Sequence, residues 1–168
     1  MQSGCVDLES LCIISGEKVW KITVNLSVIA TDGNVLDCAS IATVSSLADF
    51  SLPAVSVEGK CVRVWNELDR NPVPLVMNHL PLFNTFCLFN NGTTIICDPG
   101  EAEERLAESK LYIAVNARQE LCALKSASKK HIFPQQVFFS LFFKSIDLFS
   151  PKISYINAFL WRRKGLKI

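Results

Sequence analysis

Residues 16–41 read GEKVWKITVNLSVIATDGNVLDCASI, and the pattern changes along this stretch. Its first part alternates polar residues with apolar ones, which are Trp20, Ile22, Val24, Leu26 and Val28. A period of two predicts a strand with one buried face. The turn residues Asp32-Gly33-Asn34 then favour a helix cap, and the sequence predicts a helix over Val35 to Asp49. The many small side chains of that helix favour close packing on a sheet.

Further along the chain, turn signals separate short apolar runs. Pro53 ends the helix, and residues 55–65 predict two short strands that turn at Glu58-Gly59. Asn90-Asn91-Gly92 lies between apolar runs at 83–89 and 94–97, which predicts a hairpin. A third pairing is expected between 111–115 and 121–124, and a short acidic helix or turn over 101–108. These elements indicate an α+β fold, with a helix packed on a mostly antiparallel sheet.

Composition agrees with one domain that has a real core, since the 168 residues are 49% apolar. The seven cysteines form no C-x-x-C pair and lie in apolar runs, which favours reduced thiols and an intracellular compartment. We expect no signal peptide, and no apolar run approaches the ~18 residues that a membrane-spanning helix needs.

The strand, turn and helix of residues 16–41 resemble those of the RNase PH family, whose turn normally reads Asp-Gly-Gly-Thr-Arg-Thr and binds phosphate. The resemblance covers about residues 8–126. It implies an RNase PH-like fold (ribosomal protein S5 domain 2-like), a sheet with packed helices that is N-terminally incomplete. We therefore expect a partial RNase PH-like domain over 8–126 and a divergent, basic, Phe-rich tail over 127–168.

The phosphate-binding turn is degenerate in this chain. Its residues are Asp32, Gly33, Asn34, Val35, Leu36 and Asp37. Leu36 replaces the arginine that would bind phosphate and donates nothing, while Asp37 is expected to place a negative charge where the anion would lie. Phosphate binding at this turn is therefore not expected.

The second family signature, two aspartates that hold Mg²⁺, is degenerate as well. Counting from Asp98 places Glu104 and Lys110 at these two positions, and an ammonium group would repel a metal ion. We favour a solvated acidic face for the glutamates of 101–108 over a metal site. The two histidines, His79 and His131, have no ligand or catalytic partner nearby in the sequence. We thus expect no catalytic residue, no metal and no cofactor, and the RNA-contacting residues are not identified.

The resemblance implies a non-catalytic structural subunit of the RNA exosome core ring that supports 3′-to-5′ RNA processing and degradation. Its implied partners are other RNase PH-like ring subunits, S1/KH cap proteins, and RNA through the assembled complex, with no membrane. Its implied location is the nucleus and nucleolus, and also the cytoplasm. Two alternatives are a residual phosphorolytic 3′ exoribonuclease, supported by Glu104 alone, and a truncated product without independent function.

The C-terminal segment differs in charge from the rest of the chain. Residues 129–168 hold six Lys and two Arg against one Asp, together with seven of the eleven Phe residues. Basic and aromatic residues in one segment are compatible with RNA binding. Because the aromatics are clustered rather than spaced along a basic groove, we favour a disordered or poorly packed end.

Overall fold

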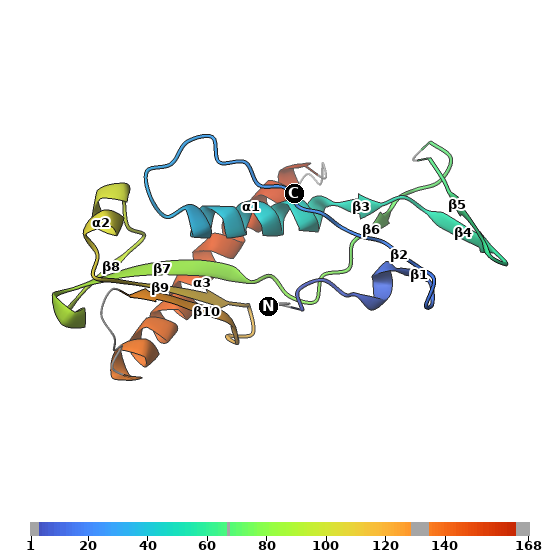
Figure 1. Cartoon of the computed structure of the whole chain (residues 1–168). Helices are drawn as coiled ribbons and strands as arrows, with labels where there is room; N and C mark the ends of the chain where they lie inside the picture. The colour runs from blue at the N-terminus through green and yellow to red at the C-terminus, as the bar shows by residue number, and fades with distance from the viewer. Residues whose placement is uncertain (1–3, 67, 129–134, 164–168) are drawn as a thin grey trace.

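The structure is a computed structural model that describes residues 4–66, 68–128 and 135–163, without the side chains of 135–136 and 159–163. Its centre is a four-stranded antiparallel sheet in the order β10-β9-β7-β8 (Figure 1). The strands are β7 (Leu82–Phe89), β8 (Thr94–Cys97), β9 (Ser109–Val115) and β10 (Leu121–Ser128). The two expected hairpins of the sheet are confirmed, and Asn90 and Asn91 adopt the positive φ that the first turn requires.

Helix α1 (Val35–Asp49) has the bounds that the sequence predicts. It lies on the face of the sheet toward which Thr85 of β7 points, because Thr85 bonds Asp37 of α1. The neighbouring Asn84 points the other way and bonds Ser145 of the long helix α3 (Gln135–Arg163). Both faces of β7 are therefore covered, which explains why nearly all its residues are buried.

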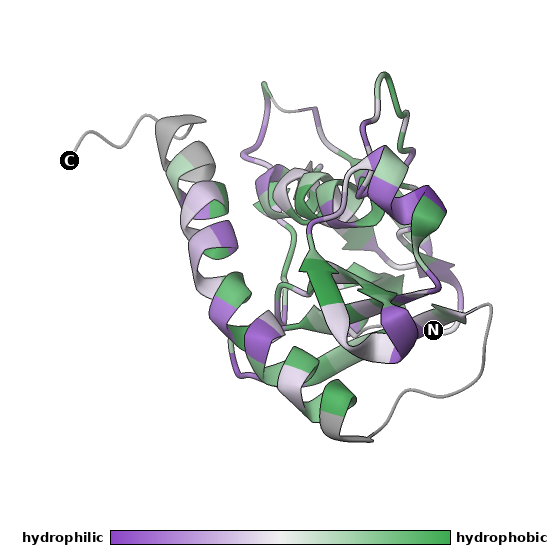
Figure 2. Ribbon diagram, turned by 90° about the vertical axis from the view of Figure 1, so that its left-hand side faces the viewer, coloured by the Kyte–Doolittle hydropathy of each residue, from purple (hydrophilic) through white to green (hydrophobic). Residues whose placement is uncertain are grey.

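Helix α3 corrects the expectation of a disordered or poorly packed tail, at least for residues 135–163. Leu141, Phe149 and Ile156 lie at most 6% exposed in the same core cluster as Phe86 and Ile113 of the sheet. Figure 2 shows α3 along one side of the molecule, carrying both hydrophobic and hydrophilic residues. The Phe-rich composition is that of a helix that packs on a sheet, while residues 129–134 and 164–168 lie outside the described part.

The expected strand over residues 20–28 is wrong. Strand pairing stops at β2 (Lys18–Val19), which pairs with β1 (Cys12–Ile14), after a short 3-10 helix η1 (Glu9–Leu11). Residues 20–31 have no regular secondary structure, and in Figure 1 the segment runs past α1 and arches away before that helix begins. The reason is that a strand needs a neighbour for its backbone groups, and none lies beside this segment in the described part of the chain.

The remaining elements are small. Strands β3 (Ser51–Leu52) and β6 (Val73–Pro74) pair near the end of α1, and β4 (Val55–Glu58) and β5 (Cys61–Val64) form the expected hairpin, which projects from the body (Figure 1). A second core cluster of Leu11, Leu52 and Leu75 lies at this end. The 3-10 turn η2 (Asn90–Gly92) joins β7 to β8, and α2 (Glu101–Leu106) precedes β9.

Candidate functional site

The turn before α1 is held against the segment that leads into α2. The Glu101 N–H donates to the Asp32 carbonyl oxygen at 3.0 Å. The Asn34 side-chain amide donates to the Asp98 carboxylate and makes no cap bond to α1, so the expected helix cap is wrong in its chemistry. Asn34 itself is in the left-handed region, with φ at +48°. The two degenerate family motifs are therefore in direct contact.

Gly33 allows this close approach. A Cβ at this position would lie 2.5 Å from the Pro99 carbonyl oxygen, and the φ of Gly33 is +97°. Any side chain would have to push the two backbones apart.

Glu104 closes the turn. The backbone N–H of Asn34 donates to Glu104 Oε1 at 2.7 Å, and Lys110 Nζ donates to Glu104 Oε2 at 2.7 Å. The side chains of Lys110 and Glu104 are 25% and 22% exposed. In the family motif, the N–H groups of this turn would face a bound phosphate. Here the Asn34 N–H faces the Glu104 carboxylate of the same chain instead.

The pKa values of this pair reflect the contact. Burial by itself raises the pKa of Glu104, but the bonds from Lys110 and the Asn34 N–H lower it overall below its ordinary value. The bond to Glu104 raises the pKa of Lys110 above its ordinary value, although burial acts in the opposite direction. Both shifts favour the charged forms, so the pair is ionic at neutral pH. The expectation of a fully solvated acidic face is wrong for Glu104.

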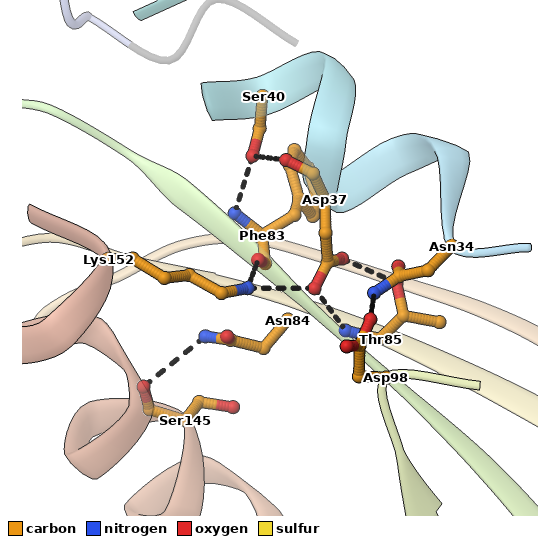
Figure 3. A network of polar contacts seen from close by, with 9 residues as sticks. All are labelled: Asn34, Asp37, Ser40, Phe83, Asn84, Thr85, Asp98, Ser145 and Lys152. Carbon is orange, nitrogen blue, oxygen red and sulfur yellow. Dashed lines mark hydrogen bonds and ion pairs between the residues drawn. The ribbon is translucent and has the colours of Figure 1, made fainter. Parts of the chain in front are cut away.

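Asp37 faces the core instead of the turn (Figure 3). Its Oδ1 accepts from Thr85 Oγ1 at 2.6 Å, and its Oδ2 accepts from the Thr85 N–H at 3.2 Å and from Lys152 Nζ at 2.8 Å. Lys152 also donates to the Phe83 carbonyl oxygen at 2.9 Å. The expectation that Asp37 repels an anion at the turn is therefore replaced by a structural role, because its charge is satisfied by α3.

Two neighbouring contacts extend this network (Figure 3). Ser40 Oγ donates to the Asp37 carbonyl oxygen and accepts from the Phe83 N–H at 3.2 Å. On the other face, Asn84 Nδ2 donates to the Ser145 carbonyl oxygen at 3.3 Å, which leaves Asn84 Oδ1 buried without a partner among the described residues. The network joins α1, β7 and α3.

The structure thus brings together Asp32, Gly33, Asn34, Glu104 and Lys110 and separates Asp37 from them. Val35 and Leu36 open α1 and make no hydrogen bond through their side chains. The sequence reasoning missed Lys152 and Thr85, the partners of Asp37. The signal that could have found Lys152 is the helical spacing of Leu141, Phe149 and Ile156, which predicts a helix with one face toward the core.

Other chemistry is not apparent in the described part of the chain. No group of three or more His, Cys, Asp or Glu side chains is placed there to hold a metal ion. His79 Nε2 is buried without a partner among those residues, and His131 lies outside them. No helix described here is long and apolar enough to cross a membrane. The cysteines are all free, but only Cys87 is fully buried, whereas Cys12, Cys38 and Cys61 are exposed.

Two models of one protein family match the regions of the chain that carry these motifs. Residues 7–53 match domain 1 of the 3′ exoribonuclease family, and residues 79–144 match domain 2. Together the matches span well over half of the chain. The chain belongs to the 3′ exoribonuclease (RNase PH) family. The second match extends past residue 127, so the family likeness reaches into α3, although the domain boundary at 126–127 stays a prediction.

Individual relatives agree with this family. The exosome complex component RRP45 of Rattus norvegicus is 43% identical over 136 residues, which cover 81% of this chain and 31% of that protein. The Homo sapiens RRP45 is 42% identical over 80% of this chain and 31% of its own length. The rrp45 of Schizosaccharomyces pombe is 38% identical over 81% of this chain and 47% of its own length. The chain therefore spans less than half of the length of these relatives.

Solved structures confirm the RNase PH-like fold. A chain of the Archaeoglobus fulgidus exosome with RNA bound to the active site superposes with a TM-score of 0.72 at 25% identity, over 87% of this chain and 52% of that one. A chain of an archaeal exosome core also gives 0.72, at 23% identity, over 98% of this chain and 58% of that one. The second likeness concerns the fold alone.

Proposed function

We propose that the chain acts as a non-catalytic ring subunit of the RNA exosome, of the RRP45 type. Residues 8–126 also resemble the subunit called exosome component 9. The observation that carries the non-catalytic part is the closed turn. The Asn34 N–H of the turn, where the family motif would bind phosphate, donates to Glu104. Glu104 and Lys110, at the positions where the second motif would hold a metal ion, form an ion pair with each other. The ring assignment is supported by likeness to proteins named as exosome components.

In this role the chain would contact other RNase PH-like subunits and S1/KH cap proteins and would meet RNA through the assembled complex. Nuclear, nucleolar and cytoplasmic location belongs to the same proposal. The chain spans only part of the length of its relatives. We therefore propose that it contacts the other ring subunits through the surface of the region that it shares with them.

Affinity purification of the tagged chain with mass spectrometry tests assembly. We expect RNase PH-like ring subunits to co-purify in near-stoichiometric amounts. Recovery of the chain without any ring subunit would contradict the proposal and favour a product without independent function.

A residual phosphorolytic activity is the second candidate, supported by the carboxylate that Glu104 retains. Its ion pair with Lys110 opposes this reading, because a coordinating carboxylate must be free to bind a cation. We expect no nucleoside diphosphate when the chain is incubated with oligoadenylate, Mg²⁺ and phosphate. Release that is abolished by Glu104→Gln would establish the enzyme instead.

A further inference from the structure

The segment between β2 and α1 has backbone groups that nothing pairs. Among the described residues, no backbone or side-chain hydrogen bond involves any residue from Lys21 to Ala30. Trp20 still donates to Leu11, and Asp32 still accepts from Glu101, so in the described chain hydrogen bonds hold the segment only at its two ends. Unpaired backbone in an alternating sequence is a template for strand pairing.

The segment is also loosely packed on α1. A cavity of about 320 Å³ lies between residues 20–25 and the end of α1, and one of about 310 Å³ lies between residues 26–33 and its beginning. Val24, Leu26 and Val28 are 42%, 54% and 62% exposed. Both hollows are open to solvent, and a well-packed contact between a segment and a helix would leave no gap of this size, so the segment has room to change its conformation.

We propose that residues 18–32 pair with the same residues of a second copy of this chain, as an antiparallel two-fold strand pair. The proposal goes beyond the ring-subunit function and does not depend on it. The sequence is self-complementary in the register that places Asn25 opposite its own copy. There Val24 lies opposite Leu26, and Ile22 lies opposite Val28.

Faces and charges both fit this register. Residues opposite each other in such a pair lie on one face of the sheet, so the apolar row that begins with Trp20 and Ile22 meets the same row of the second copy. Trp20, Ile22 and Leu47 of α1 all pack against the core cluster of Leu11, Leu52 and Leu75, so each copy's α1 would lie on the apolar side of the pair.

The charges of the segment explain why a second copy is the partner. Its charged residues are Lys18, Lys21 and Asp32. In the proposed register Lys18 lies opposite Asp32 at both ends, and Lys21 lies opposite the uncharged Ile29. No residue therefore lies opposite one of like charge, and the pair contains two Lys18–Asp32 contacts of opposite charge. This pattern is expected of a strand that pairs with its own copy.

Sedimentation equilibrium of the full chain over a range of concentrations tests the pairing. We expect a monomer–dimer equilibrium. Val24→Lys should abolish the dimer, because it places two ammonium groups on the apolar face of the pair. The matched control is Thr23→Lys, one residue away on the polar face, which should dimerise as the natural chain does. Both positions are exposed in the monomer, so circular dichroism should report the same fold for both variants.

A charge reversal tests the register. Lys18→Glu and Asp32→Lys should each weaken the dimer by about tenfold, and the two together should restore it. A monomer at all concentrations would overturn the proposal. So would a dimer that Val24→Lys leaves intact, or single charge variants whose losses the double variant does not recover. Ring subunits that co-purify with Val24→Lys would show that the ring function and the self-pairing are separate.

Discussion

At the scale of single residues, several positions that the resemblance assigns to the family's phosphate and metal motifs contact one another. The Asn34 N–H and Lys110 Nζ both donate to Glu104, and Gly33 lets the two motifs touch. Charge-assisted hydrogen bonds from a backbone N–H and an ammonium group stabilise the ionised carboxylate of Glu104 at this turn. The residues that remain from the family signature therefore support the fold.

The pH dependence of stability should report the Glu104–Lys110 pair. The folded pKa of Glu104 is lowered, so its contribution is present above the unfolded value near 4.5 and is lost as the pH falls through the lower folded value. Lys110→Met removes the partner, so we expect the natural chain's advantage over this variant to shrink below about pH 4.5. Urea unfolding at pH 3 to 7 measures it. A constant difference over this range would contradict the ionic contact.

The stabilisation by the Glu104–Lys110 pair should also decrease at alkaline pH. The folded pKa of Lys110 is raised above 10.5, so its contribution is complete below that pH and is lost as the pH rises through the folded value. In the Glu104→Gln variant, the stability should therefore change less between pH 8 and 11 than in the natural chain. Thermal unfolding between pH 8 and 11 checks the expectation, with Glu101→Gln, an exposed neighbour on α2, as the control.

The Asp37–Lys152 pair should matter more, because Asp37 is only 5% exposed. Lys152→Met leaves a buried carboxylate without its cation, and we expect a loss of about 3 kcal/mol in the free energy of unfolding. Asp37→Asn in the same chain should recover part of that loss, because no buried charge then remains. A double-mutant cycle by urea unfolding measures the coupling, and additive losses would contradict it.

At the scale of elements, α3 completes the domain. Its residues reach the sheet on the face opposite α1, and Lys152 then meets α1 itself. Deletion of residues 129–168 is expected to lower the solubility of the chain, because Leu82, Phe86 and Ile113 would lose their cover.

A milder change tests the same contact. Leu141→Ala, at 1% exposure, should lower the free energy of unfolding by about 2–5 kcal/mol. Tyr155→Ala on the exposed face of α3 is the control and should cost little, since that side chain is 77% exposed. Equal effects of the two substitutions in urea unfolding would show that α3 does not pack as described.

At the scale of the whole molecule, stability is unevenly distributed. Strand β7 of the central sheet is covered on both faces, whereas residues 21–30 make no hydrogen bond within the described chain and the β4–β5 hairpin projects alone (Figure 1). Uncovered backbone and exposed apolar side chains of this kind favour aggregation or partner binding, so we expect the isolated chain to be aggregation-prone.

Hydrogen exchange should map this distribution. In dilute solution, where any dimer dissociates, we expect the amides of residues 21–30 to exchange at nearly unprotected rates and those of β7 and β9 to exchange slowest. Protection of residues 21–30 that appears only at high concentration would agree with self-pairing. Protection that is independent of concentration would contradict the open segment.

The sequence by itself determined the elements whose information is local. Helix α1 and the hairpins at 55–64, 82–97 and 109–128 follow from helix spacing, Asn-Gly turns and short apolar runs. The degenerate turn and the substitution at Lys110 were equally visible, because each depends on a residue type at a known place in a family motif.

Only the tertiary structure decided what depends on partners distant in the chain. Residues 20–28 have the pattern of a strand, but alternation does not supply the neighbour that a ladder needs. Asp37 looked like a residue of the turn, yet its cation comes from Lys152, which is 115 positions away. The role of α3 could not be read from its composition, because clustered aromatics have the same composition in a disordered tail and in a helix packed on a sheet.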